Sequence, residues 1–280
     1  MYDDSPAWRV MFNMLLSMYH NHPVRIDIAG TTESIAKIDH GLLYKCYNTF
    51  YNPANMFICI AGNVDTDKVL KQIDEGINTS LPVEITRINA EEPDSVVEPY
   101  IEQKLDVAQP MFCFGFKETV EKPERTVKEK ICTALLLELI AGDASPLYKQ
   151  LINDGLINDE FSSEYFTGYG YSAVLFEGES SNPQAVAEKI KEEIKRLKTE
   201  GIDKKLFSAV RRGMYGNAVR LFNNVDDIAM QFIDCAMFGN GLFDEIKYLK
   251  SVTVDDVFRR LSLLDGEKSV LSVINPLEEG

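Results

Sequence analysis

Residues 22–65 read HPVRIDIAGTTESIAKIDHGLLYKCYNTFYNPANMFICIAGNVD, and three local patterns follow one another in this stretch. Thr32 is a suitable N-cap for a short helix, and Asp39 is one for a second helix through Phe50 in which apolar side chains recur at helical spacing. The continuous apolar run at 56–61 is typical of a strand that is covered on both faces. The stretch therefore predicts a loop, two helices and a buried strand.

The composition limits the classes of protein to which this chain can belong. The chain has 280 residues, of which 45% are hydrophobic and 26% are charged, and its formal net charge is −15. This length exceeds the usual size of one domain, so one large or two medium domains are expected. The negative charge repels phosphate backbones and anionic lipid, and no basic stripe counters it. We therefore expect neither nucleic-acid binding nor membrane association.

The cysteines and the apolar segments bear on where in the cell the protein is expected. The chain has no C-x-x-C pair, and its five well-separated cysteines are Cys46, Cys59, Cys113, Cys132 and Cys235. Unpaired thiols within apolar runs are typical of a reducing compartment. The longest apolar segments, such as residues 131–141, are too short to span a bilayer, and no charged-then-apolar leader is present. These features predict a cytoplasmic protein.

Helical and strand patterns continue along the chain with one interruption. Residues 82–99 contain three prolines and five acidic residues without periodicity, which predicts a linker, taken as residues 82–107. Helices are predicted at residues 5–19, 65–77, 126–141, 145–151, 182–198, 203–222, 225–238, 242–249 and 254–264. Strands are predicted at residues 109–116, 161–166, 171–176 and 268–274.

The end of the chain repeats a pattern found near its beginning. The helix and strand at 39–61 correspond to the helix and strand at 255–274, at an offset of about 215 residues. This self-similarity predicts two domains, at residues 1–81 and 108–280. By the same offset, the first domain lacks roughly the first 110 residues that its counterpart has.

Residues 22–65 also resemble a known family. The order H-P, G-T-x-E-S-I, F-Y-x-P-x-N-M and A-G-N-V-D is similar to the insulinase or pitrilysin family of zinc peptidases, and in particular to a bacterial member like the processing peptidases. The resemblance implies an α+β fold of two insulinase-like domains, the first truncated at its N-terminus, with helices on one face of a mostly antiparallel sheet. In this family the two domains enclose a chamber for an extended peptide, which can add as a strand to an exposed sheet edge.

The zinc site of that family has no counterpart in this sequence. The H-x-x-E-H motif supplies two His ligands and the general-base Glu. This chain contains no such motif, and its histidines are His20, His22 and His40. The helix at 126–141 corresponds to the zinc helix and contains Glu138 but no His. The opening residues resemble the segment after the third zinc ligand, so the resemblance implies a fragment that begins just after the zinc site.

The resemblance implies two functions from different classes. The first is a fragment of a zinc metallopeptidase that forms chamber wall and is inactive alone, with no cofactor in this chain and zinc expected in the full-length enzyme. The second is a non-catalytic scaffold or peptide-binding partner subunit. The expected partner is a peptide substrate or a second insulinase-like subunit. The uncovered edge of the truncated first domain also predicts a homo-oligomer.

No catalytic or metal-binding residue is assigned in this chain. His20 and His22 form an H-x-H pair, but two ligands without a third are a weak metal site, and we interpret them as ordinary loop histidines. The acidic pairs Glu91-Glu92 and Glu192-Glu193 are expected to be solvated faces.

Substrate-binding residues also stay unassigned. The Arg and Tyr with which the family holds substrate correspond to positions near Ile152 and Asn158, so the pair is lost here. Tyr165 and Arg211 are the candidates that could replace it. For both, packing or exposure to solvent is the competing interpretation.

Overall fold

The computed structural model describes residues 4–77, 85–86, 88 and 91–277. Contacts divide the chain into two compact units. Unit 1 consists of residues 1–29, 89–214 and 248–280, and unit 2 consists of residues 30–88 and 215–247. Part of the expected linker, including residues 82–84, lies outside the described residues.

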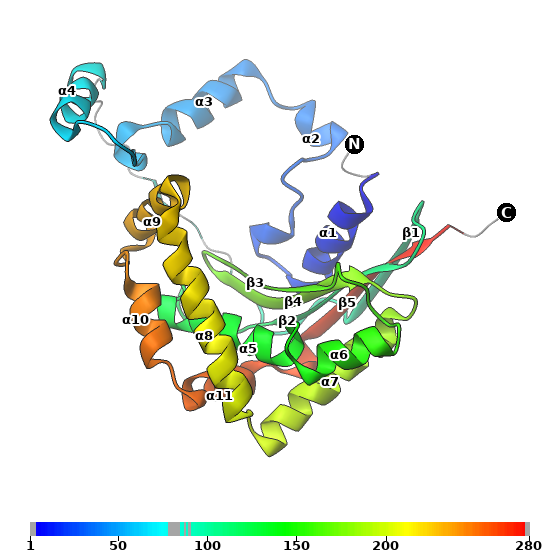
Figure 1. The fold of residues 1–280 in the computed structure, drawn as a ribbon. Helices are drawn as coiled ribbons and strands as arrows, with labels where there is room; N and C mark the ends of the chain where they lie inside the picture. The colour runs from blue at the N-terminus through cyan, green and yellow to red at the C-terminus, as the bar shows by residue number, and fades with distance from the viewer. Residues whose placement is uncertain (1–3, 78–84, 87, 89–90, 278–280) are drawn as a thin grey trace. The chain divides into compact units, whose positions relative to one another are not determined.

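Unit 1 is built on a mixed five-stranded sheet (Figure 1). The strands lie in the order β1-β5-β2-β4-β3, in which β1 and β5 are parallel and the other neighbours are antiparallel. Four of the strands were expected from the sequence, and β1 was not. Their bounds are Tyr100–Leu105 (β1), Met111–Lys117 (β2), Ser162–Gly168 (β3), Tyr171–Glu179 (β4) and Ser269–Pro276 (β5).

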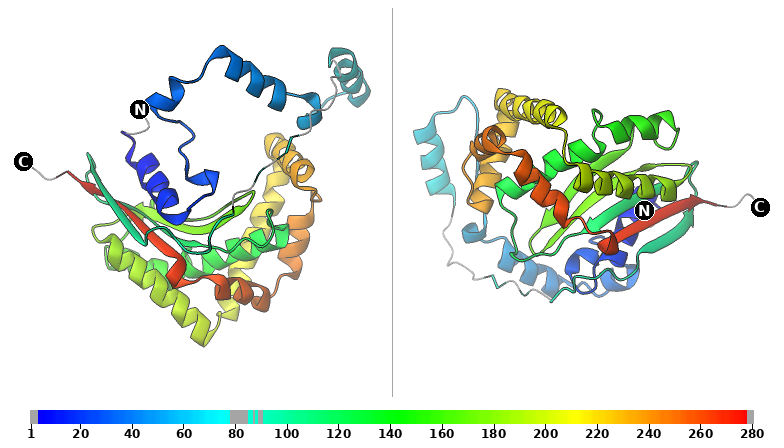
Figure 2. Two further views of the ribbon diagram at one scale, coloured as in Figure 1. Left: turned by 180° about the vertical axis from the view of Figure 1, so that it is seen from behind. Right: turned by 90° about the horizontal axis from the view of Figure 1, so that it is seen from below.

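Helices cover both faces of this sheet (Figure 2). The helix α1 contacts β1, β2 and β5 on one face, and α7 contacts β2 and β5 on the other. The expectation of helices on one face only is therefore wrong. The helices that lie wholly in unit 1 are α1 (Pro6–Met18), α5 (Val127–Ala141), α6 (Pro146–Asn153), α7 (Pro183–Glu200) and α11 (Val254–Leu263).

The two faces follow from the alternation of side chains along β2. Cys113 belongs to the buried cluster that includes Met14 and Met18 of α1. Its neighbour Phe114 points to the opposite face, where Lys191 of α7 lies over its ring at 5.5 Å. A Cβ at Gly115 would lie 2.5 Å from Leu175 Cδ2 and 3.2 Å from Met18 Cε, so a glycine here permits the close approach of α1.

Local sequence accounts for the ends of these helices. Thr126 and Glu129 form a reciprocal capping box at the start of α5, and Asn182 caps α7 just before Pro183. By length and composition alone, Val127–Asn153 is apolar enough to cross a membrane, contrary to the expectation that no segment is. However, 61% of its most apolar window is buried inside the protein, and core helices of folded proteins pass the same test.

Unit 2 contains helices but no strand among its described residues. Asp39 caps α3 as predicted, whereas the first short helix is capped by Thr31 rather than Thr32. The helices α3, α4 and α9 bury none of their residues. The bounds are α2 (Thr32–Ile35), α3 (His40–Phe50), α4 (Thr66–Gly76) and α9 (Val225–Phe238), while α8 (Lys204–Arg220) and α10 (Asp244–Ser251) belong partly to each unit.

The expected strand at 56–61 is not formed. These residues have no strand neighbour in the described part of the chain, and an extended segment becomes a strand only when a ladder partner takes its backbone groups. The described chain therefore holds a single α+β domain on one mixed sheet, and the prediction of two such domains is wrong. The expected α+β class itself is confirmed for unit 1.

Candidate functional site

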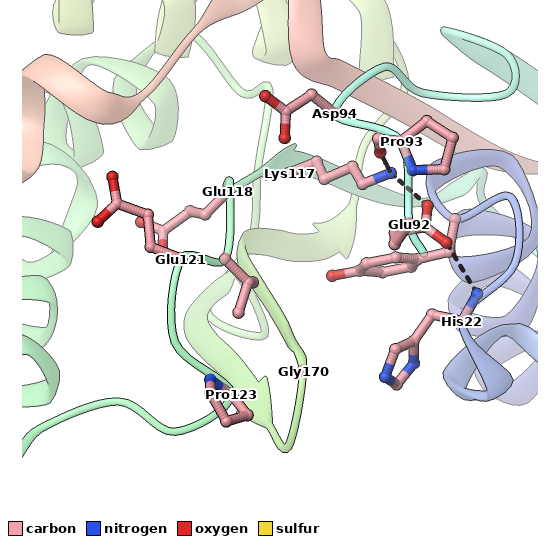
Figure 3. Close-up of a pocket in the computed structure, with 11 residues that line it drawn as sticks. His22, Glu92, Pro93, Asp94, Lys117, Glu118, Glu121, Pro123 and Gly170 are labelled. Carbon is pink, nitrogen blue, oxygen red and sulfur yellow. Dashed lines mark hydrogen bonds and ion pairs between the residues drawn. The ribbon is translucent and has the colours of Figure 1, made fainter. Parts of the chain in front are cut away.

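A cavity of about 220 Å³ lies in unit 1, beside the end of β2 and the turn between β3 and β4 (Figure 3). Its walls include Tyr19 and His22 from the chain after α1, Glu92 from the segment before β1, and Lys117 and Glu118 from the end of β2. Ionisable groups gathered around a cavity are candidates for a reaction centre, and their partners decide whether they can act as one.

Lys117 is buried, and its side chain is 3% exposed. Its ammonium lies 2.6 Å from Glu92 Oε1 and also donates to the carbonyl oxygens of Pro93 (2.7 Å) and Ser95 (2.9 Å). Burial lowers the pKa of Lys117, and the Glu92 carboxylate opposes that shift. All three ammonium protons have protein acceptors, so this lysine is a fixed cation and not a free base.

Glu92 holds the chain that follows α1. Its carboxylate accepts hydrogen bonds from the backbone amides of His20 (2.8 Å), Asn21 (2.7 Å) and His22 (2.8 Å). Burial alone would raise the pKa of Glu92, but Lys117 and these three amides lower it to about 2. The expectation that Glu92 is solvated is wrong, because its carboxylate binds these amides. The amides lie about 70 residues away in the sequence, so no local pattern predicts the contact. Glu91 is exposed, as expected.

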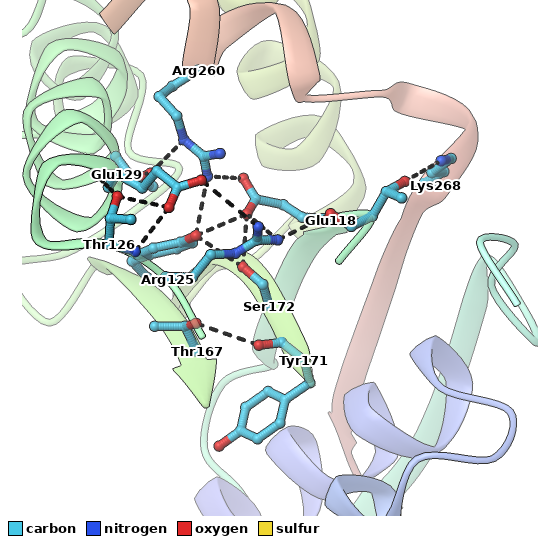
Figure 4. Close-up of polar contacts among 12 residues, drawn as sticks. Glu118, Arg125, Thr126, Glu129, Thr167, Tyr171, Ser172, Arg260 and Lys268 are labelled. Atoms are coloured by element: carbon cyan, nitrogen blue, oxygen red, sulfur yellow. Dashed lines mark hydrogen bonds and ion pairs between the residues drawn. The ribbon is translucent and has the colours of Figure 1, made fainter. Parts of the chain in front are cut away.

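A second cluster of ionic side chains surrounds Glu118, the residue that follows β2 (Figure 4). Glu118, 2% exposed, accepts from Ser172 Oγ (2.7 Å), from Tyr165 Oη (2.9 Å) and from the guanidinium of Arg260. Burial opposes ionisation of Arg260, but Glu118 raises its pKa. Arg260 also donates to Thr133 Oγ1 at 2.9 Å, so the group joins the residue after β2 to β3, β4, α5 and α11.

The charged side chains of these two groups are not available for catalysis. Lys117, Glu92, Glu118 and Arg260 each have protein partners for their polar atoms in the described structure. A general base or nucleophile needs an uncommitted atom aimed at the substrate. The cavity is therefore a structural junction rather than a reaction centre. Glu193, the second acidic residue expected to be solvated, is likewise buried and paired with Arg196 at 2.7 Å.

The edge of the sheet at β3 has the opposite character. β3 pairs only with β4 among the described strands, so alternate amides and carbonyls along its outer side lack a ladder partner. Beside this edge lie the exposed Glu164 and the half-buried Glu177. Burial raises the pKa of Glu177, and the charge of Glu164 raises it further. Cys113 Sγ donates to Glu177 at 3.4 Å. Neither carboxylate has a Lys or Arg partner within the described ranges, so the exposed Glu164 places an uncompensated negative charge beside the edge.

The two histidines of the H-x-H pair have separate partners. His22 Nδ1 accepts from the amide of Val24 (3.1 Å) and its Nε2 lies 3.2 Å from the carbonyl oxygen of Tyr169. His20 Nε2 lies 3.3 Å from Ser95 Oγ. Groups of three or more His, Cys, Asp or Glu side chains suited to a metal ion do not occur among the described residues.

The candidate substrate contacts are separated by the fold. Tyr165 is committed to the Glu118 group, and burial raises the pKa of its hydroxyl. Arg211 packs over Phe207 at 5.4 Å and donates to the carbonyl oxygen of Val252 at 3.1 Å. Asn158 donates to Glu179 at 3.0 Å, and Ile152 is 37% exposed. The structure does not bring these four together.

Sequence comparisons connect the chain to a family. The profile of the peptidase M16 inactive domain matches residues 37–214, which is more than half of the chain. The zinc protease YmfH of Bacillus subtilis is 35% identical over 92% of this chain and 61% of that protein, and YmxG of the same organism is 25% identical over 96% and 62%. The chain thus spans less than two thirds of the length of these relatives.

Solved structures show the same fold. An M16-like peptidase from Alicyclobacillus acidocaldarius superposes with a TM-score of 0.93 at 28% identity, covering 99% of this chain and 67% of that chain. A peptidase M16 inactive domain from Pseudomonas fluorescens superposes with a TM-score of 0.80 at 14% identity, covering 99% and 66%. The second likeness concerns the fold alone.

Proposed function

Because this chain belongs to the peptidase M16, or insulinase-like, family through its inactive-type domain, we propose that it is the non-catalytic part of a zinc metallopeptidase and holds an extended peptide substrate. The free edge of β3 supports this proposal most directly. An extended peptide gains main-chain hydrogen bonds by adding to such an edge. Glu164 and Glu177 beside it favour a peptide with basic side chains.

The residues of this chain do not fit a zinc ion. A catalytic zinc site needs about three protein ligands and a base. The sequence has no H-x-x-E-H motif, and the described residues contain no cluster of ligating side chains. We therefore derive no hydrolytic step from this chain. In this proposal the metal and the bond-breaking chemistry belong to polypeptide outside it, while this chain binds and orients.

The role in binding is testable with an unstructured peptide that alternates Lys with apolar residues. We expect binding that weakens about tenfold in Glu164→Lys, because the substitution reverses a charge beside the edge. The matched control is Glu267→Lys, an exposed charge reversal just before β5, which is separated from β3 by β2 and β4 in the sheet. Equal affinity of both variants and the unsubstituted chain would contradict a peptide site at β3.

The lack of activity of the isolated chain is a separate expectation. Incubated with zinc and the same peptide, the chain should give no products, whereas it should still bind. Turnover that a chelator abolishes, in a preparation free of contaminating protease, would show that this chain has a metal site of its own.

A second candidate function is a non-catalytic scaffold or partner subunit of the same family. The observation that favours it is the match to a domain described as inactive in a chain without the zinc motif. The two candidates differ in whether a polypeptide with the H-x-x-E-H motif is encoded together with this chain or on a separate gene. The sequence upstream of Met1 distinguishes them.

We also propose that the protein works in the cytoplasm. All five cysteines are free thiols, which suits a reducing compartment. Fractionation of the source cells with an antibody against unit 1 tests this, and recovery from outside the cytoplasm would contradict it.

A further inference from the structure

A cavity of about 460 Å³ lies in unit 1, where α7 ends and α8 begins. We call it the α7–α8 pocket. Its floor is apolar, because Leu139 of α5, Leu197 of α7 and Ile202 line it and are buried. Pro146 of α6 and Leu206 of α8 also line it. Sites for small molecules are concave, mostly apolar and roughly 300–1,000 Å³ in volume, so this pocket has the size and the floor of a ligand site.

The polar rim of the α7–α8 pocket is acidic. It contains the carboxylates of Glu193, Glu200 and Asp203 and one cation, Arg196. The guanidinium of Arg196 donates to both oxygens of Glu193, at 2.8 and 2.7 Å, and to one oxygen of Glu200 at 2.8 Å. Three carboxylates and one guanidinium leave the lining with a formal charge of −2.

Two carboxylates of this rim keep an oxygen available to a ligand. Glu193 does not, because Arg196 occupies both of its oxygens and its side chain is only 9% exposed. Arg196 takes Oε2 of Glu200, whose side chain is 62% exposed. Asp203 accepts two amides of the first turn of α8 through Oδ1 alone. Within the described structure, Glu200 Oε1 and Asp203 Oδ2 therefore have no protein donor.

The lysines close to these residues in the sequence do not neutralise the rim. Lys198 donates to the carbonyl oxygen of Leu264, while Lys204 and Lys205 are exposed and form no ion pair with a described carboxylate. The end of α7 adds negative partial charge, because the last carbonyl groups of a helix lie at the negative end of its dipole. Asp203 already caps the positive end of α8. The charge around the pocket thus favours a cation.

An acidic rim beside an apolar floor is complementary to one chemical class of ligand. We propose that the α7–α8 pocket binds a primary ammonium carried on an apolar chain, with the ammonium at Glu200 and Asp203 and the chain on the apolar floor. An ammonium has three donor protons, and the free carboxylate oxygens accept them. A free alkylamine and the side chain of a lysine in a peptide share this chemistry. The pocket lies among helices and does not include β3, so the inference goes beyond the proposed peptide site.

Hexylamine is the probe for this pocket, and hexanol and hexanoate are its matched controls. Binding to the full 280-residue chain is followed by the NMR chemical shifts of the amides of Gly201 and Ile202. We expect hexylamine to saturate one site with a Kd of about 1 mM, and hexanol and hexanoate to bind at least about fivefold more weakly. Raising the salt concentration from about 20 mM to about 500 mM should weaken hexylamine but not hexanol, because salt screens exposed charges.

A peptide distinguishes the two sources of the ammonium. Acetylated and amidated Ala-Lys-Ala offers a lysine side chain as its only cation. Shifts of the same two amides at a Kd similar to that of hexylamine would support the proposal with a peptide side chain as the ligand. Shifts with hexylamine alone would support it with a free amine as the ligand.

The decisive variant removes the two charges and keeps the local fold. Glu200→Gln with Asp203→Asn retains the cap of α8, because asparagine caps a helix as well as aspartate does. This double variant should weaken hexylamine about fivefold and leave hexanol unchanged. The matched control is Glu192→Gln, which removes an exposed carboxylate of α7 that does not line the pocket and should bind hexylamine as the unsubstituted chain does.

Three results would overturn the proposal. The first is equal affinity for hexylamine and hexanol, and the second is hexylamine binding that the double variant leaves intact. The third is loss of hexylamine binding in Glu164→Lys, which would place the amine at β3 instead. Because Glu164 does not line the α7–α8 pocket, its substitution tests the proposed peptide site separately from this inference.

Discussion

Unit 1 and unit 2 are parts of one chain with similar apolar content, yet they differ in what they do with it. In unit 1, α5 buries nine of its residues between the sheet and neighbouring helices. In unit 2, α3, α4 and α9 bury none. An amphipathic helix is stable in water mainly through the packing of its apolar face. Among the described residues, unit 1 therefore has a buried core of its own, whereas α3, α4 and α9 of unit 2 leave their apolar side chains exposed or half-buried.

Removing a charge from the core of unit 1 should have the largest effect on stability. Glu118→Ala leaves the guanidinium of Arg260 buried without its carboxylate, and it also removes the ion pair between Glu118 and Arg125 at 3.8 Å. We expect a loss of about 3–5 kcal/mol in the free energy of unfolding, measured by urea titration. The control Glu121→Ala removes an exposed carboxylate and should change stability by less than about 0.5 kcal/mol. Similar values for both variants would show that the buried ionic group does not hold unit 1 together.

Truncating the same side chain in each unit compares the two regions directly. Leu135 of α5 is 0% exposed, whereas Leu43 of α3 is 60% exposed. Leu135→Ala should cost about 2–5 kcal/mol because it removes buried contacts and leaves a cavity. Leu43→Ala should cost less than about 0.5 kcal/mol in the isolated chain. Equal costs in urea unfolding would mean that α3 is packed after all.

Acid should weaken the attachment of α1 to the sheet. The pKa of Glu92 is lowered from its ordinary value of 4.5 to about 2, so its stabilising effect is complete above the unfolded value and is lost as pH falls through about 2. Glu92→Gln should therefore cost about 1–3 kcal/mol at pH 7, and the difference from the unsubstituted chain should shrink between pH 5 and 2. Urea unfolding at several pH values measures this. A difference that does not change with pH would indicate that the carboxylate charge is not what matters.

The sequence was sufficient for elements that are fixed locally. The cap Asp39 and the apolar spacing at residues 39–50, 126–141 and 182–198 predicted α3, α5 and α7. The strand β1 was missed because Tyr100–Leu105 contains three consecutive polar residues, Glu102 to Lys104, within the expected linker, and only the parallel pairing with β5 makes it a strand. The prediction for residues 56–61 was wrong for the opposite reason. Their composition suits a strand, but the described residues provide no strand beside them.

The polar groups of unit 1 depend on contacts that no local pattern contains. Glu118 and Arg260 are separated by 142 positions, and Glu92 lies 70–72 positions from the amides that it binds. Acidic pairs in a loop are most often solvated, so Glu92 was interpreted that way. Only the fold, which places the end of α1 beside this loop, makes its half-buried carboxylate an acceptor for these amides. The family was visible from the sequence, since the residues that suggested it lie largely within the matched range.

Hydrogen exchange of the isolated chain tests the contrast between the two units most directly. Mass spectrometry can follow the amides of β2 and β4 in unit 1 and those of α3 and residues 57–61 in unit 2 in one experiment. We expect the strands to exchange only with global unfolding, and the amides of unit 2 to exchange at least about 100-fold faster because little buried surface holds them. Equal protection of both units in a chain shown to be monomeric would contradict the difference in burial between unit 1 and unit 2.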